Sequence, residues 1–425
     1  MRFPKNQPAL KIFLCPILPF QEIFVVLQSP NIKKCMKYNF DQVIPRRGTD
    51  SLKWDEPSAE DVLPMWVADM DFRVPPVITD ALARRVEHGI FGYAKVPDAY
   101  VQTEAHWFAW RHGWQLQPEW VLPTIGVVPA VTAVIKALTH PGDKVLVLSP
   151  VYHCFYACIR HAGCEVVAGE LLQTKGHYTI DIDLLDRQLA DPTVRVFLLC
   201  NPHNPVGRVW TREELERVGE LCLRHGVYVL ADEIHCEQTY AGHTYTPFAS
   251  VDARFVPSCI TCVSPSKAFN LAGLQIANIV VPDAQLRQQV TEALAVNEVN
   301  HVSPLGFVAL QAAYSPEGAE WLDELCNYLW RNFTYMRDYL AENLPECPVT
   351  PLEGTYLPWV DCRATGKSSD VLTEMLLQNA GLMVNSGAMY GVGGEGFLRL
   401  NIACPQSLLV QGLERLVRLL APLCR

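Results

Sequence analysis

The sequence predicts an α/β protein, in which a central, mostly parallel sheet between two layers of helices is followed by a smaller α+β domain. Short apolar segments of strand length alternate with helical segments between residues 127 and 281, as is typical of a parallel sheet with helical connections. From about Pro304 onward the pattern changes to longer helices. The chain has 425 residues, too many for a single hydrophobic core.

The first elements of this pattern are a helix and the strand that follows it. Val127–His140 is predicted to be the helix, because apolar residues recur at helical spacing and Pro129 suits the first turn. Pro141–Gly142–Asp143 is expected to end it. Lys144–Ser149 has the apolar character of a buried strand.

Further strands and one well-marked helix complete the sheet. The helix covers Thr211–His225, with Thr211 and Glu214 spaced as a capping box and Gly226 at the end. The predicted strands are Val194–Cys200, Val227–Ala231, Ser258–Ser264 and Ile276–Val281. Ligands of open α/β sheets bind at the carboxyl ends of the strands, so polar residues there are the first candidates for a site.

Three later segments are candidate strands of the smaller domain. They are Thr355–Val360, Gly381–Asn385 and Phe397–Ile402. The glycine-rich run Gly391–Gly396 resembles a dinucleotide-binding loop, but no helix is predicted after it and no acidic residue follows at the required distance. We interpret this run as a flexible loop before the last strand.

Composition and charge limit the classes of partner and the cellular compartment that are expected for this protein. The formal net charge is -10 and no basic stripe is visible, which argues against nucleic acid as a partner. No run of 18 apolar residues predicts a membrane span. The 15 cysteines are scattered through strand-like segments, as expected in a reducing cytosol, so a cytoplasmic location is predicted. Cys259 and Cys262 have CxxC spacing, but they lie inside a predicted strand without a second such pair, and no metal site is predicted.

Lys267 is the candidate catalytic residue. It lies in Ser264–Gly273, directly after a predicted strand and among hydroxyl and small side chains. A lysine in such a place suits a Schiff base with an aldehyde cofactor, since burial and nearby cations lower its pKa. The alternatives are a solvent-facing lysine or a serine-nucleophile motif, whose partner motifs are absent.

Asp232 follows the strand Val227–Ala231 and is the candidate partner of a pyridine nitrogen. A carboxylate at that point keeps the nitrogen protonated, so that the ring accepts electrons from the substrate. Asp232 and His235 could instead form half of a metal site, but no third ligand accompanies them. Glu233 is expected to serve packing or hydrogen bonding.

Three further segments complete the expected cofactor site. Gly126, Val127 and Val128 stand at a helix start, where backbone N–H groups bind phosphate. Asn204 lies in a rigid turn and could donate to a phenolate oxygen. Tyr152 could stack on a pyridine ring, although a lone aromatic residue is more often part of the core.

Arg399 is the candidate substrate-binding residue. It interrupts the apolar strand Phe397–Ile402, and a buried arginine needs an anionic partner. A substrate carboxylate would serve, and a structural salt bridge is the alternative.

Together these motifs resemble those of fold-type I pyridoxal-phosphate (PLP) enzymes, which have the fold of aspartate aminotransferase. Within that superfamily, the likeness is to the MalY/PatB group of cystathionine β-lyase-like carbon–sulfur lyases. It starts at residue 36 and runs essentially to the C-terminus. The segments that carry it are Met65–Phe72, Phe91–Tyr93, Ala231–His235, Ser266–Gly273, Gly354–Leu357 and Phe397–Asn401.

The resemblance implies further site residues. Ser264 and Ser266 would help to bind the cofactor, as would His235, which stands where many relatives have a tyrosine. Tyr93 would reach the cofactor of a partner subunit, so that a homodimer shares its active sites. Tyr356 would join Arg399 at the amino-acid substrate. Gln275 replaces an arginine common in the aminotransferases, and this departure, with that at His235, favours the lyase group.

The implied activity is PLP-dependent α,β-elimination from L-cystathionine or related cysteine S-conjugates, giving a thiol, pyruvate and ammonia. An aminotransferase of class I/II is the alternative enzyme, and a PLP-binding regulatory protein with secondary lyase activity is the alternative from another class. Residues 1–35 have no counterpart in the family and are expected to be an extension or a misassigned start. The resemblance implies a segment 36–75 that joins the small domain, a large PLP-binding domain at 76–310 and a small domain at 311–425.

Overall fold

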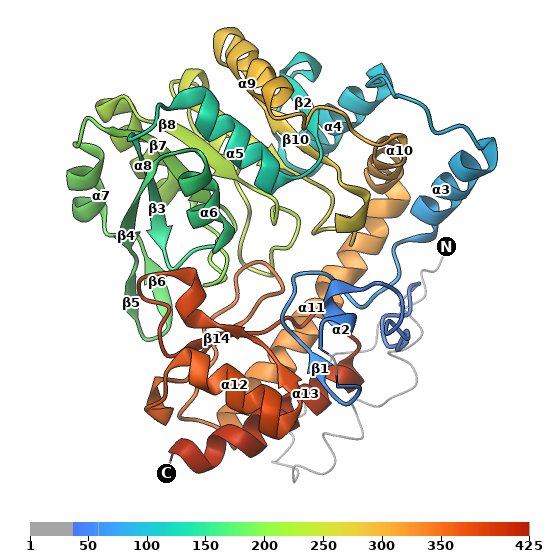
Figure 1. The fold of residues 1–425 in the computed structure, drawn as a ribbon, viewed down its shortest axis with the longest axis vertical. Coiled ribbons are helices and arrows are strands. Elements are labelled where there is room, and N and C mark those ends of the chain that lie inside the picture. Colours follow the sequence, from blue (N-terminus) through green and yellow to red (C-terminus); the bar gives the residue numbers. More distant parts are fainter. Residues whose placement is uncertain (1–36, 58, 425) are drawn as a thin grey trace, which may run out of the picture. The chain divides into compact units, whose positions relative to one another are not determined.

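A seven-stranded sheet forms the centre of the fold in the computed structural model, which describes residues 37–57 and 59–424 (Figure 1). Residues Phe40–Arg425 form one compact unit, which contains all the helices and strands that are described. The strand order is β2-β10-β9-β8-β7-β3-β4, and only β10 runs antiparallel to its neighbours. The strands are β2 (Val121–Thr124), β3 (Lys144–Ser149), β4 (Glu165–Glu170), β7 (Val194–Cys200), β8 (Tyr228–Asp232), β9 (Cys259–Val263) and β10 (Ala277–Val280). The predicted mostly parallel sheet is confirmed.

The register of the central strands places their carboxyl ends at one edge of the sheet. Cys200 at the end of β7 is paired with Asp232 at the end of β8. Asp232 is in turn paired with Cys262 in β9. The segments that follow these strands therefore start side by side, which brings the turn with Asn204 and the loop with Lys267 to the same edge as Asp232.

Helices cover the sheet, with α5 at the centre of its main core cluster. Buried side chains of α5 pack with those of α6, α9 and the neighbouring strands. The helix ends at Leu138, two residues earlier than predicted, and Thr139 is already extended. In chain order, the helices from α3 to α11 are α3 (Pro76–His88), α4 (Asp98–His112), α5 (Val127–Leu138), α6 (Cys154–His161), α7 (Ile182–Leu189), α8 (Arg212–His225), α9 (Ala284–Val296), α10 (Pro304–Ala313) and α11 (Pro316–Asn343).

The predicted capping box of α8 is present. Thr211 is the N-cap, its side chain accepts from the backbone N–H of Glu214, and the Glu214 side chain accepts from the N-cap backbone. Gly226 ends the helix in the left-handed conformation, as the sequence indicates. Both signals are local, which explains why the sequence reveals them.

A second, three-stranded antiparallel sheet has the order β11-β14-β13, and Arg399 in β14 is paired with Trp359 and Asn385. Two pairs of short strands accompany it, β1 with β12 in parallel and β5 with β6 antiparallel. The remaining elements are α2 (Leu52–Asp55), β1 (Leu63–Pro64), β5 (Leu172–Thr174), β6 (His177–Thr179), β11 (Trp359–Asp361), α12 (Ser369–Ala380), β12 (Leu382–Met383), β13 (Asn385–Ser386), β14 (Phe397–Arg399) and α13 (Gln406–Leu420).

The strands of this second sheet are shorter than predicted. After Arg399 the backbone changes partners from residue to residue, with Leu400 N donating to Pro358 O and Asn401 N donating to Met65 O. The extended chain thus continues, but its regular ladder stops. Between β13 and β14, the run Gly391–Gly396 is followed by a strand and not by a helix, which agrees with its interpretation as a loop.

Two expectations remain outside these observations. Residues 1–35 lie outside the described part of the chain. The division at 76–310 and 311–425 stays a prediction. Among the described helices, none combines the length and the apolar character needed to cross a bilayer.

Candidate active site

A cavity of about 400 Å³ opens at the carboxyl ends of the central strands. Its walls come from the loops after β7, β8 and β9, the start of α5, β14 and the segment Trp66–Ala68. Most of the residues predicted for the site share this lining, and they are Gly126, Val127, Val128, Tyr152, Asn204, Asp232, His235, Ser266, Lys267 and Arg399.

Lys267 is half-buried, and its Nζ donates to the backbone O of Ala68 at 2.6 Å. Removal from water lowers the pKa of Lys267 to about 8, and the Arg399 cation acts in the same direction, while Asp69 and Asp232 oppose it. A larger share of the amine is therefore uncharged near neutral pH than for a lysine in water. This is the state in which an amine attacks a carbonyl carbon.

Asp232 is 4% exposed at the end of β8, and one oxygen accepts from the backbone N–H of Ile234 at 3.1 Å. No ion-pair partner lies within 4.0 Å among residues 37–57 and 59–424. Burial raises the pKa of Asp232 to about 7. A buried carboxylate without a cation partner is costly, so this geometry suits a ligand that brings a protonated nitrogen.

Arg399 is 2% exposed, and its charge is not neutralised by any carboxylate of the described part of the chain. Nη1 donates to Asn204 Oδ1 at 3.2 Å and Nη2 to the backbone O of Trp66 at 2.8 Å. Nε is buried and has no hydrogen-bond partner among the described residues. The structural salt bridge considered as an alternative is thus absent there, and the guanidinium can still bind an anion.

The start of α5 contributes backbone donors to the cavity. Gly126 is its N-cap, has an extended backbone and provides no side chain to cap the helix. The N–H groups of the first turn have no partner within the helix, so this end of α5 is suited to bind phosphate. Ser264 lies behind the wall, where its Oγ donates to Ile276 O at 2.6 Å and accepts from Ser266 N at 3.0 Å.

Aromatic and imidazole rings complete the walls. Burial lowers the pKa of His235 to about 3, with Lys267 and Arg399 adding to the shift, so this ring is neutral. His153 has a pKa of about 4 for the same reason, burial first and Arg399 second. Tyr356 is fully buried behind the lining, and its hydroxyl donates to Ala68 O at 3.0 Å. Lys267 and Tyr356 thus share one acceptor.

Tyr93 is the predicted site residue that this chain does not bring to its own cavity. It is fully exposed, and with Phe91 it lines a neighbouring groove of about 360 Å³. Ile125 and Gln275 border both the groove and the cavity. A second chain seated in the groove would therefore lie next to the site.

Several lining residues were not predicted. They include Leu52, Trp66, Val67, Ala68, His153, Asn385 and Met389. Ala68 contributes a backbone carbonyl, which leaves no trace in a residue pattern. Leu52, Asn385 and Met389 come from distant parts of the chain, and only the tertiary fold brings them to this edge of the sheet.

The donor set fits pyridoxal phosphate. Lys267 would supply the amine for the aldehyde, Asp232 the carboxylate for the ring nitrogen, and the start of α5 the donors for the phosphate. The free guanidinium of Arg399 remains for the carboxylate of an amino acid. Every unmatched charge at the cavity thus has a counterpart on the cofactor or on the substrate.

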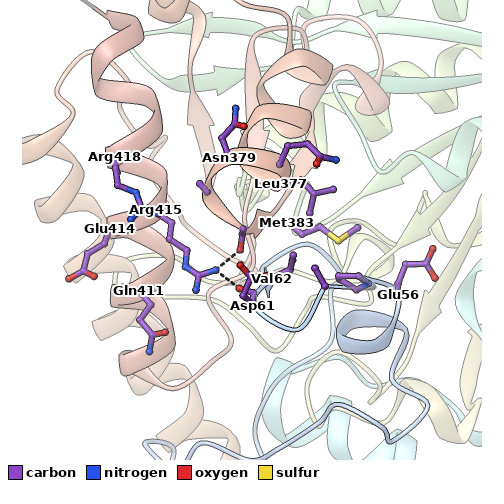
Figure 2. A pocket seen from close by; sticks show the side chains of 15 residues that line it. Glu56, Asp61, Val62, Leu377, Asn379, Met383, Gln411, Glu414, Arg415 and Arg418 are labelled. Carbon is purple, nitrogen blue, oxygen red and sulfur yellow. Dashed lines mark hydrogen bonds between the residues drawn. The ribbon is translucent and has the colours of Figure 1, made fainter.

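A larger hollow of about 770 Å³ lies between the segment around Asp61, the end of α12 and α13 (Figure 2). Arg415 reaches toward it, but its Nη1 already donates to Asp61 O at 2.7 Å and Gly381 O at 2.5 Å. No predicted site residue lines this hollow. The larger volume of this hollow therefore does not identify it as the active site.

Comparisons with known proteins agree with this geometry. The family model of aminotransferase class I and II matches residues 60–416. Cystathionine beta-lyase PatB of Bacillus subtilis is 42% identical over 382 residues, which cover 89% of this chain and 98% of PatB. Protein MalY of Escherichia coli is 34% identical over 386 residues, which cover 89% of this chain and 98% of MalY.

Solved structures give the same result. Cystalysin from Treponema denticola, which contains a pyridoxal 5'-phosphate cofactor, superposes with a TM-score of 0.88 at 35% identity, over 91% of this chain and 100% of that chain. The PLP-bound C-S lyase from Staphylococcus hominis has a TM-score of 0.85 at 31% identity, over 91% and 99% of the two chains.

Proposed function

The chain belongs to the aminotransferase class I and II family, and from this premise we propose that it is a PLP-dependent carbon–sulfur β-lyase. It cleaves the bond between Cβ and sulfur in L-cystathionine or related cysteine S-conjugates. With water, the products are a thiol, pyruvate and ammonium. The observation that carries the proposal is the trio of unmatched charges, Lys267, Asp232 and Arg399, around one cavity.

Each member of this trio has a defined task at a stated atom. Pyridoxal phosphate, when bound, supplies an electrophilic carbon for the substrate amine and a ring that accepts the electron pair of Cα. Arg399 binds the α-carboxylate and fixes the orientation of Cα. The Nζ of Lys267 takes the Cα proton as general base. Asp232 holds the proton on the ring nitrogen, and the first turn of α5 holds the phosphate.

The departure of sulfur follows from the weak basicity of a thiolate. The electron pair that the lost proton leaves at Cα forms a double bond to Cβ, and sulfur departs as a thiolate with the pair of its bond to Cβ. In the proposed reaction, the protonated Lys267 then returns its proton to the leaving sulfur. Neutral His153 and His235 add no positive charge to the walls, so Arg399 is the cation that selects the carboxylate.

An aminotransferase would use nearly the same residues and is the second candidate, because the family model itself carries that name. The two activities differ in what they consume. Purified protein is incubated with L-cystathionine in the absence of any 2-oxo acid, and pyruvate and free thiol are measured. We expect both products in equal amounts. A strict requirement for an added 2-oxo acid would instead assign the aminotransferase activity.

A homodimer with shared active sites is part of the proposal. It is supported by the exposed segment Ile90–Tyr93, whose three large side chains face solvent in the single chain. It is also supported by the groove beside Tyr93, which shares Ile125 and Gln275 with the cavity. Tyr93 of one subunit would then reach the cofactor phosphate of the other.

A cytoplasmic location is the last part of the proposal. The cysteines in the described part of the chain are free thiols, and most of them are buried. Buried thiols of this kind are usual in proteins that stay in a reducing compartment.

A further inference from the structure

The backbone of the segment Trp66–Ala68 holds two residues of the active site at once. Ala68 O accepts from Lys267 Nζ at 2.6 Å, and Trp66 O accepts from Arg399 Nη2 at 2.8 Å. The two acceptors are two residues apart, so any movement of this segment displaces the amine and the guanidinium together. What fixes the segment therefore matters for both groups.

A network of four charged side chains lies directly beyond this segment. Arg46 binds Asp69 Oδ2 and Asp71 Oδ1, each at 2.7 Å. Lys53, which is 1% exposed, binds Asp71 Oδ2 at 2.7 Å. The two cations balance the two carboxylates, and the network anchors the chain immediately after Ala68.

The two carboxylates of the network differ in one respect. Both oxygens of Asp71 are engaged, since Oδ1 also accepts from Trp54 Nε1 at 2.8 Å. Asp69 uses only Oδ2, and its Oδ1 is buried without a hydrogen-bond partner among the described residues. A buried polar atom left unpaired costs about 1–3 kcal/mol. Packing alone gives no reason for this cost.

The charges around Lys267 supply a reason. Arg399 disfavours the ammonium form of Lys267, whereas Asp69, Asp232 and Cys154 favour it. Asp232 is committed to the ring nitrogen in the proposed function. Asp69, next to the residue that holds the amine, is the carboxylate that remains to stabilise a positive charge on Lys267.

We propose that Asp69 is a positioning residue for Lys267, which holds Ala68 O against the amine and stabilises the ammonium that forms when Lys267 takes the Cα proton. Arg46 fixes the Asp69 carboxylate through its Oδ2. The inference rests on the proposed function only because that function names Cα as the source of the proton. The hydrogen bonds and ion pairs belong to this chain and do not depend on the reaction.

The test measures the protonation of Lys267 directly. The full chain is freed of cofactor and labelled with acetic anhydride over a range of pH, and acetylation of Lys267 is followed by peptide mass spectrometry. Acetic anhydride reacts with the neutral amine, so the midpoint of the rate profile reports the pKa of Lys267. In Asp69→Asn we expect a lower midpoint, with roughly three- to tenfold more neutral amine at pH 7, since one pKa unit is a factor of ten.

Matched variants separate the loss of the Asp69 charge from a loosening of the network that anchors the segment Trp66–Ala68. Asp71→Asn makes the same chemical change two residues away and in contact with the same Arg46, and we expect it to leave the midpoint in place. Asp69→Glu keeps the charge and should return the midpoint toward the wild-type value. Asp69→Ala also removes the unpaired oxygen, and it replaces the Asn variant if that does not fold.

Two outcomes would overturn the inference: an unchanged midpoint in the folded Asp69 variants, or an equal shift in Asp71→Asn. Steady-state kinetics of the loaded enzyme give a second readout, in which Asp69→Asn lowers kcat severalfold and leaves KM near its wild-type value because Arg399 is intact. A wild-type protein that releases no pyruvate would refute the lyase function and leave the labelling result valid, so the two failures are distinguishable.

Discussion

Lys267 is proposed to use one atom for two tasks, since Nζ both holds the cofactor and takes the Cα proton. Lys267→Ala should therefore lose both. We expect pyruvate formation to fall by about 10²–10⁴-fold or more, the typical contribution of a positioned acid–base group. Borohydride should no longer fix the cofactor to the chain, as judged by intact mass. Lys136→Ala is the control, because Lys136 is exposed and its Nζ donates to Asn297 Oδ1 on the surface; full activity in Lys267→Ala would contradict the assignment.

Arg399 has an uncompensated charge at the cavity, and this makes its removal informative. Arg399→Ala should reduce kcat/KM roughly ten- to over a hundredfold, since hydrogen bonds to charged groups contribute about 1.5–3 kcal/mol. The loss should be mainly in KM, with the cofactor still bound by absorbance. Arg399→Lys should rescue poorly, because a point charge cannot replace the guanidinium fork.

The control for Arg399 is Arg363→Ala. Arg363 is paired with Asp361 on the surface next to the same sheet. Its removal should leave KM unchanged. If Arg399→Ala binds amino acids normally, the carboxylate site must lie elsewhere.

Asp232 predicts a pH dependence of stability in the cofactor-free protein. Burial raises its pKa in the folded state to about 7, above the 3.8 of an aspartate in water. Between these values the folded state binds more protons than the unfolded chain, so stability falls as pH rises from about 4 to 7. Asp232→Asn removes this penalty. We expect the variant to raise Tm over wild type at pH 8 and to change it little at pH 4, while pyruvate formation is lost. An equal gain at both pH values would show that the carboxylate is not the cause.

Side chains of the site were predictable where they lie at or just after the end of a strand and carry their own chemistry. Lys267, Asp232 and Arg399 are of this kind. Ala68 and Asp69 were not, because one acts through a carbonyl and the other through a charge that only the tertiary structure brings near Lys267. His153 follows Tyr152 directly, but a histidine in that position has no pattern that separates a cavity wall from a core residue.

The loop before β14 leads into the strand of Arg399, and its Gly394 is required by close backbone contact. A Cβ on Gly394 would lie 2.2 Å from Gly387 O. Gly394→Ala should therefore force the loop away from η6 (Gly387–Tyr390) and lower Tm, with a cost of about 1–3 kcal/mol as for other overpacked sites. KM should rise as β14 shifts. In Gly273→Ala the added Cβ meets no atom within 4 Å, so thermal unfolding should stay near wild type. Equal melting temperatures for the two variants would contradict the expectation.

Elements were predictable where the signal is local. The capping box of α8 and the buried strands β3 and β7 are examples. The edge strands β2 and β4 were not predicted, because β2 contains Pro123 and only one of the six β4 residues is buried. Edge strands tolerate such residues, so their sequences resemble loops. The antiparallel direction of β10 is equally hidden, since direction depends on the path of the chain between strands.

Sharing of sites between subunits gives a prediction for the whole molecule. Lys267→Ala and Tyr93→Ala should each be inactive or nearly so. In a homodimer with shared sites, random pairing of equal amounts leaves one in four sites intact, so mixing and re-pairing the two variants should restore about a quarter of wild-type activity. The measurement is pyruvate release before and after mild dissociation and reassociation. No recovery in a mixture that forms heterodimers by native mass spectrometry would place both residues in one subunit's site.

The hydrogen bonds between Trp66–Asp69 and Arg399–Asn401 span up to 334 residues of sequence, and this separation has a consequence during synthesis. At about 5–20 residues per second, the ribosome needs roughly 17–67 s between making the two segments. Met65, buried in the finished fold, has to wait about as long before its backbone O can accept from Asn401 N. A nascent chain can build most of its central sheet while it is still attached, but it lacks the proposed carboxylate-binding site until its last few dozen residues emerge. On the proposed function, the chain must therefore be almost fully translated before it can bind substrate.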